Sequence, residues 1–85
     1  MGLIKLFVKQ SCAKCPQAKQ LGSVLKDEGY NVIEYDVTTV DGLAEASFYS
    51  VQATPTFILE DDDENLLGDF RGEVPAPEKI KEMLG

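Results

Sequence analysis

Histidine and tryptophan are absent from this 85-residue sequence, and cysteine occurs only at positions 12 and 15. A structural zinc site normally has four cysteine or histidine ligands, so an intramolecular site would need two carboxylates as well. A disulfide between such close residues closes too small a loop to stabilise a fold appreciably on the chain-entropy model. We therefore expect a chemically reactive cysteine pair and predict no bound metal or cofactor. A metal ion or iron–sulfur cluster shared by two chains through Cys12 stays open as an alternative.

Long apolar segments are also missing. No run approaches the ~18 residues of a membrane span. Leu3–Val8 is interrupted by Lys5, and no signal-peptide cleavage pattern follows it. Internal repeats and flexible linkers are absent too, so we expect one domain over residues 1–85. A cytoplasmic protein without a membrane partner is expected, and in that compartment a close cysteine pair is more often catalytic or metal-binding than structural.

Acidic residues are absent from the first 26 positions, which hold five lysines. Residues 27–85 hold all fifteen acidic residues and three basic ones, and the net charge of the chain is −7. This balance argues against nucleic acid as a partner. The cysteine pair lies in the only basic part of the chain, which has two interpretations. Either the lysines form a solvated helix face, or they stabilise a thiolate.

The segment around the cysteines has the pattern of a strand–helix–strand unit. Residues 3–9 form a nearly continuous apolar run, which is typical of a strand buried on both faces. A helix from about Ala13 to Glu28 follows, and residues 31–37 form the second strand. The helical crossover predicts that the two strands pair in parallel. One apolar stripe of the helix contains Cys15, Ala18, Gly22 and Leu25.

The second half of the chain predicts a helix, a hairpin and a final helix. Thr38 or Thr39 is expected to cap the first of these. The acidic run Glu60–Glu64 lacks the central glycine and distal glutamate of a calcium-binding loop, so we interpret it as a solvated turn. The expected ranges are about 40–49 for the helix, 56–59 and 66–71 for the antiparallel strands, and about 76–84 for the last helix, with Ile80, Met83 and Leu84 facing inward.

The two cysteines are expected to have different roles. Cys12 lies near a helix N-terminus, where unpaired N–H groups and the helix dipole favour an anion. The nearby Lys9 and Lys14 act in the same direction, so the pKa of the Cys12 thiol should lie below the free value of about 8.5. Cys15 lies one turn later on the apolar stripe and should be more buried. Cys12 is therefore the expected nucleophile and Cys15 the resolving thiol of a disulfide exchange.

Three motifs resemble the thioredoxin/glutaredoxin superfamily in its short, glutaredoxin-sized form. They are Cys12-Ala13-Lys14-Cys15 after the first strand, Ala53-Thr54-Pro55 opening the third strand, and Phe70-Arg71-Gly72 before the last helix. The resemblance covers essentially the whole chain. It implies an α/β, thioredoxin-like fold of order βαβαββα, with a central four-stranded mixed sheet and helices on both faces. It also implies that Pro55 is cis and lies beside the active cysteine, and that Thr54 hydrogen-bonds the backbone of a bound substrate.

Other positions resemble one branch of the superfamily or the other. Leu6 occupies the position at which thioredoxins carry a buried aspartate. Lys9 matches a glutaredoxin lysine that helps to bind glutathione and to lower the thiol pKa, but the usual glutathione-binding pattern is absent at residues 72–75. The chain as a whole resembles the small hybrid redoxins, which are glutaredoxin-like in size and thioredoxin-like in electron supply.

This resemblance implies a small thiol-disulfide oxidoreductase, which is a protein-disulfide reductase or electron donor that cycles Cys12 and Cys15 between dithiol and disulfide. It implies disulfide-containing proteins as substrates, a thioredoxin-reductase-type flavoenzyme as the electron source, and a monomer. A glutathione-dependent glutaredoxin and a dimeric metal- or iron–sulfur-binding module that uses Cys12 are the alternatives. The expected substrate-binding residues are Thr54, Pro55, Lys9 and Lys14.

Overall fold

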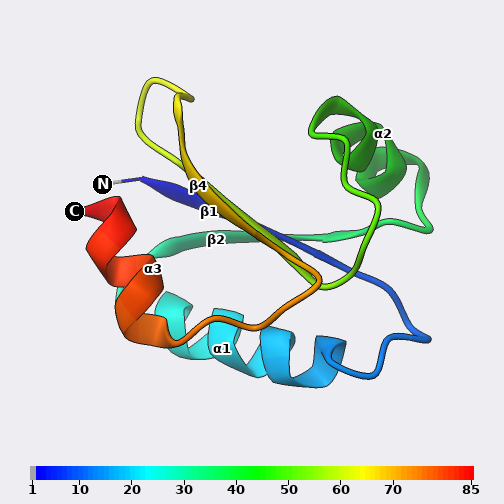
Figure 1. Cartoon of the computed structure of the whole chain (residues 1–85), viewed down its shortest axis with the longest axis horizontal. Helices are drawn as coiled ribbons and strands as arrows, with labels where there is room; N and C mark the ends of the chain where they lie inside the picture. The colour runs from blue at the N-terminus through cyan, green and yellow to red at the C-terminus, as the bar shows by residue number, and fades with distance from the viewer. Residues whose placement is uncertain (1) are drawn as a thin grey trace.

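The computed structural model describes residues 2–85, which form a four-stranded sheet flanked by three helices (Figure 1). None of these helices is both long and apolar enough to cross a bilayer. The order βαβαββα confirms the fold that the sequence motifs imply, and the observed ends differ from the expected ones by one or two residues. The elements are β1 (Leu3–Val8), α1 (Cys15–Asp27), β2 (Asn31–Asp36), α2 (Val40–Phe48), β3 (Thr56–Glu60), β4 (Leu66–Arg71) and α3 (Pro77–Leu84).

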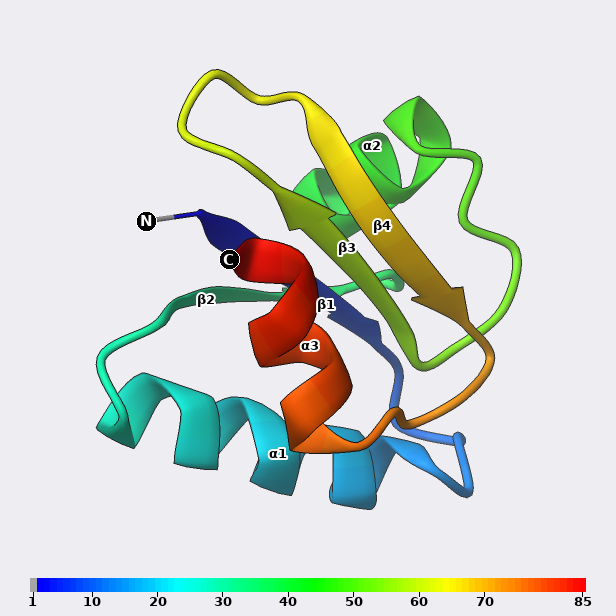
Figure 2. The same ribbon diagram turned by 60° about the vertical axis from the view of Figure 1, so that its left-hand side comes forward.

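The strands lie in the order β2-β1-β3-β4. β1 pairs in parallel with β2, from Leu3 opposite Asn31 to Val8 opposite Asp36, and antiparallel with β3. β3 and β4 form the expected antiparallel hairpin. α1 and α3 cover one face of the sheet, and α2 covers the other (Figures 1 and 2). The mixed sheet with helices on both faces is therefore confirmed.

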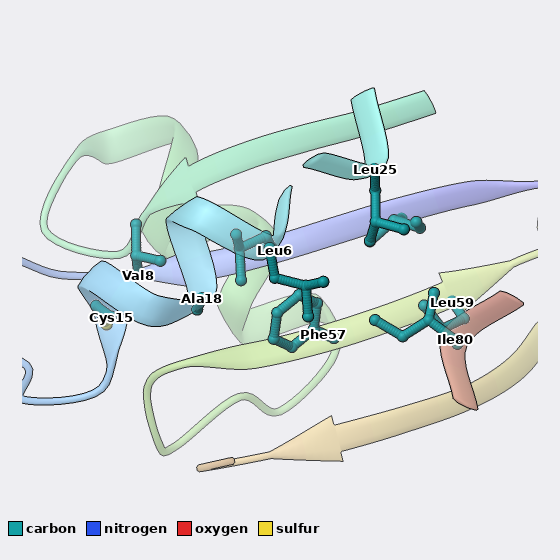
Figure 3. Close-up of a cluster of buried hydrophobic side chains, with 10 residues drawn as sticks. Leu6, Val8, Cys15, Ala18, Leu25, Phe57, Leu59 and Ile80 are labelled. Atoms are coloured by element: carbon teal, nitrogen blue, oxygen red, sulfur yellow. The ribbon is translucent and has the colours of Figure 1, made fainter. Parts of the chain in front are cut away.

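The larger hydrophobic core lies between the sheet and helices α1 and α3 (Figure 3). β1 contributes Ile4, Leu6 and Val8 to it, because alternate side chains of a strand point to the same face. Gly22 lets α1 approach the sheet closely, since a Cβ at this position would lie 3.3 Å from Leu6 Cδ2. Cys15 belongs to this core, so packing holds one of the two cysteines in place.

Helix α1 begins at Cys15, two residues later than the sequence predicts. Pro16 lies in its first turn and has no N–H to donate to the carbonyl of Cys12. The helical hydrogen bonds therefore start further along, with the N–H of Ala18 donating to the carbonyl of Lys14 at 3.1 Å. As a result, Cys12 lies in the turn before the helix.

A network of polar side chains anchors α2 to its face of the sheet. Lys5 Nζ donates to the Tyr49 hydroxyl at 2.7 Å and to Glu45 Oε1 at 3.1 Å, and it lies 3.5 Å from Glu60 Oε1. The Tyr49 hydroxyl donates in turn to Glu60 Oε2. These contacts fix the position of α2, which forms one wall of a groove beside Cys12. The smaller hydrophobic core beside this network consists of Phe7, Ala46 and Ile58.

This network predicts a loss of stability at high pH. Burial alone would lower the pKa of Lys5, but hydrogen bonds to Tyr49 and Glu45 and the charge of Glu60 outweigh it and raise that pKa above the ordinary lysine range. Burial and the hydrogen bond to Glu60 raise the pKa of Tyr49. Both groups bind protons more tightly in the folded state, so stability is full below about pH 10 and falls as pH rises above it.

We expect the urea midpoint of unfolding to be constant between about pH 8 and 9.5 and to fall steadily from about pH 10 upward. Circular dichroism at constant ionic strength measures it. Lys5→Met should flatten the fall, because it removes one of the two groups. A midpoint that does not change up to about pH 11 would contradict the prediction.

Candidate active site

The two cysteines form a disulfide between the end of β1 and the start of α1. Their Cα atoms are 5.3 Å apart, and the N–H of Cys15 donates a 3.4 Å hydrogen bond to the carbonyl of Cys12. Cys12 is partly exposed, whereas Cys15 is 2% exposed and packs with the core (Figure 3). Only one sulfur of the pair is thus open to a partner molecule.

Cys12 borders a groove of about 540 Å³ that is open to solvent. Of the residues expected from sequence to act here, Lys9, Cys12, Lys14 and Thr54 line it together. Pro55 and Cys15 are buried and do not line the groove. The remaining lining comes from the turn at Ser11 and Ala13, from α2 and its neighbouring loops, and from the end of β4: Val37, Leu43, Ala46, Val51, Gln52, Ala53 and Gly72.

The rim of the groove next to Cys12 is positively charged. Lys9 and Lys14 are exposed, and neither forms an ion pair within residues 2–85. The first turn of α1 contains no acidic residue. The helix N-terminus and both lysines therefore place positive charge near the Cys12 sulfur. Once the disulfide is reduced, each of these charges stabilises a thiolate on Cys12.

Ala53 and Thr54 line the groove that Cys12 borders, and the buried Pro55 and Thr56 follow them in the chain. The peptide bond between Thr54 and Pro55 is cis. The carbonyl of Pro55 accepts a 2.7 Å hydrogen bond from the N–H of Gly72, and the hydroxyl of the buried Thr56 donates to the carbonyl of Ala53 at 2.8 Å. Gly72 has a φ of +73°, a left-handed conformation that glycine adopts without a Cβ clash. These bonds hold the backbone of Thr54 at the groove.

Arg71, the only arginine of the sequence, fixes the loop that leads into this segment. Its Nη1 donates to the carbonyl of Ser50 at 3.1 Å and its Nη2 to that of Tyr49 at 3.0 Å. Its Nε donates to Asp69 at 2.8 Å. The guanidinium thus binds the C-terminal end of α2, where backbone carbonyls lack helical partners. The sequence motifs include Arg71 but do not indicate this role.

The thioredoxin-like fold, with a cysteine pair at the edge of a groove and one sulfur accessible, defines a protein-disulfide oxidoreductase. A family model of the thioredoxin domain matches residues 3–85, and the chain belongs to this family. This confirms the resemblance found in the sequence motifs.

One curated relative and two solved thioredoxin structures are similar to this chain. A probable thioredoxin from Archaeoglobus fulgidus is 36% identical over 62 residues, which cover 72% of this chain and 68% of the relative. The structure of a mutant thioredoxin from Halobacterium salinarum matches with a TM-score of 0.82 at 21% identity, over 98% of this chain and 71% of that one. A thioredoxin from Fasciola hepatica matches with a TM-score of 0.78 at 25% identity, over 98% and 77% of the two chains.

Proposed function

We propose that this chain is a protein-disulfide reductase in which Cys12 is the nucleophile and Cys15 the resolving thiol. The observation that carries the proposal is the difference in exposure within the pair. The Cys12 sulfur faces an open groove, whereas Cys15 is 2% exposed beneath it. An intermolecular mixed disulfide can therefore form at Cys12, and only an intramolecular attack can come from Cys15.

The reaction consists of two thiol–disulfide exchanges. The Cys12 thiolate attacks one sulfur of a substrate disulfide, a mixed disulfide forms, and the other substrate sulfur leaves as a thiolate. The Cys15 thiol then loses its proton to solvent or to the leaving thiolate and attacks the Cys12 sulfur. This step forms the Cys12–Cys15 disulfide and releases the second substrate thiolate. Two electrons pass from the protein to the substrate, and a reductant must restore the dithiol.

The groove wall supplies a place for the substrate backbone. The backbone of Thr54 is held by the hydrogen bonds around the cis peptide bond, next to the groove that Cys12 also lines. We assign the backbone of Thr54 to binding an extended segment of the substrate protein and the buried Pro55 to supporting that backbone. Lys9 and Lys14 form the rim that favours the thiolate. One chain contains all of these groups, so we propose that the protein acts as a monomer.

We propose a thioredoxin-reductase-type flavoenzyme as the reductant. Insulin reduction, followed as turbidity, is expected with NADPH and such a reductase, and at a rate at least about tenfold lower when glutathione and glutathione reductase replace it. Comparable rates with the two systems would reject this electron source and leave the reductase activity itself in place. No reduction of insulin even with dithiothreitol would reject the proposed function.

A glutathione-dependent glutaredoxin is the second candidate, because Lys9 lines the groove together with Cys12. It predicts rapid turnover of a glutathione mixed disulfide with glutathione as the sole reductant, and a loss of that turnover in Lys9→Met. Absence of turnover removes this candidate.

A further inference from the structure

The outward face of α2 is open to solvent and carries three large apolar side chains beside the exposed Asp41. Val40, Leu43 and Phe48 are 86%, 58% and 79% exposed. Ala44 and Ser47 are also exposed and lie on the same side of the helix, at spacings of three, four and seven residues. We call these five residues the α2 stripe. Exposed helix faces usually carry charged or polar residues, so three large exposed apolar side chains on one nine-residue helix indicate contact with another molecule.

The α2 stripe is continuous with the active-site groove. Leu43 lines the groove that Cys12 borders, and it also belongs to the stripe. In Figure 1, α2 lies on the opposite side of the sheet from α1 and α3, and no other helix or strand of residues 2–85 packs on its outer side. The α2 stripe is therefore open to solvent. A polypeptide that reacts with Cys12 and extends along the groove toward α2 therefore meets the stripe at Leu43.

An acidic pocket lies at the other edge of α2, next to Phe48. Its volume is about 330 Å³, and three carboxylates but only one ammonium line it. The Glu60 side chain is 4% exposed, and its Oε1 accepts no hydrogen bond from residues 2–85. The Lys5 ammonium lies 3.5 Å from that oxygen and balances only one of the three carboxylates. The pocket therefore keeps an excess of negative charge and an oxygen free to accept a hydrogen bond, which suits a cationic group that donates hydrogen bonds. The other charged groups of the acidic pocket are Glu45, Glu64 and Lys5.

We propose that the α2 stripe and the acidic pocket bind the segment of a substrate protein that flanks its reducible cysteine. That segment is apolar and carries an arginine or lysine whose cationic group enters the acidic pocket. The inference rests on the proposed function, because reaction at Cys12 is what brings the segment to α2. A second copy of this chain fits less well, since its net charge of −7 opposes an acidic pocket.

The length of α2 sets the spacing in the substrate. The helix has nine residues, which is about 13 Å at 1.5 Å per residue. An extended segment covers this distance with four or five residues at about 3.3 Å each. The basic residue should therefore lie at least about five positions from the reacting cysteine.

Two labelled peptides of about twelve residues test the proposal by fluorescence anisotropy. Each has a central serine in place of the reacting cysteine and leucine and alanine on both sides. One ends in arginine at both ends and the other in glutamate. The wild-type chain should bind the arginine peptide about tenfold more tightly. Val40→Ser/Phe48→Ser should weaken this binding about tenfold, and Glu64→Gln should reduce the difference between the peptides to about threefold.

Val24→Ser is the matched control, because Val24 is a 43% exposed apolar residue of α1 on the other side of the sheet. It should change binding less than about twofold. Equal affinity for the two peptides would overturn the proposal, and so would equal losses in Val24→Ser and Val40→Ser/Phe48→Ser. A wild-type dimer in sedimentation that the double variant abolishes would assign the stripe to a second copy instead.

Reduction of 2-hydroxyethyl disulfide separates this inference from the proposed function. This small substrate reacts at Cys12 without reaching the stripe. The wild type and the variants Val40→Ser/Phe48→Ser, Glu64→Gln and Val24→Ser, once reduced, should therefore all reduce it at the same rate. If the wild type does not reduce it but still distinguishes the peptides, the function fails and the binding surface stands. If all four reduce it and the peptides bind alike, the binding surface fails and the function stands. Urea unfolding of Val40→Ser/Phe48→Ser checks that the helix is intact, and Glu64→Gln tests the pocket independently of the stripe.

Discussion

Cys12→Ser is expected to lower the rate of insulin reduction more than about 100-fold, because the serine hydroxyl stays protonated and cannot form the mixed disulfide. Cys12 is the sulfur that borders the groove, and Cys15 is too deeply buried to replace it as the attacking group. The measurement is the initial rate of turbidity with dithiothreitol as reductant, corrected for the rate without protein.

Cys15→Ala should fail in a different way. Its Cys12 can still attack, but no second thiol breaks the mixed disulfide, so the covalent complex with the substrate should accumulate and appear by non-reducing mass spectrometry. Ser23→Ala, an exposed position of α1, is the control for general effects on the helix. Near-wild-type activity in Cys12→Ser, or an equal yield of mixed disulfide from Cys12→Ser and Cys15→Ala, would contradict the assigned roles.

The parts of this site that follow from local sequence were predictable. Apolar periodicity placed Cys15 in the core and Cys12 outside it, and the structure shows this difference. A threonine before α2 indicated a cap, and Thr39 accepts a hydrogen bond from the N–H of Gly42 at 3.0 Å. Such signals act within one turn or one strand, so neighbouring residues are enough to reveal them. Helix α1 starts two residues later than its apolar pattern predicts, because Pro16 has no N–H for the first helical hydrogen bond.

The groove itself was not predictable from local signals. Val37, Leu43 and Val51 line it because α2 packs on the opposite face of the sheet from α1, and the periodicity of a nine-residue helix with apolar residues on both sides does not show which face is buried. Arg71 and Lys5 show the same limit. The carbonyls that Arg71 binds lie 21 and 22 residues away along the chain, and the side chains that Lys5 binds lie 40 and 44 residues away. The sequence therefore shows Lys5 only as an interruption of an apolar strand.

Lys5→Met is expected to lower the free energy of unfolding by about 3 kcal/mol, since removing one member of a buried ion pair leaves its partner charged and uncompensated. The Lys5 side chain is 11% exposed and the Glu60 side chain 4% exposed. Without the ammonium, the Glu60 carboxylate keeps the Tyr49 hydroxyl as its side-chain donor within residues 2–85. A small domain has a total stability of only about 5–15 kcal/mol, so the loss is large. Urea unfolding at pH 7 measures it.

The cost should come from the unpaired carboxylate and not from the lost lysine, and a second substitution distinguishes these causes. Lys5→Met/Glu60→Gln should recover about half of the loss, because a neutral amide is cheaper to bury than a carboxylate. Lys19→Met is the matched control. Lys19 lies 3.9 Å from Glu34 and both are exposed, so its effect should stay within about 0.5 kcal/mol. If Lys5→Met costs no more than Lys19→Met, the network does not anchor α2, and another contact must hold this wall of the groove.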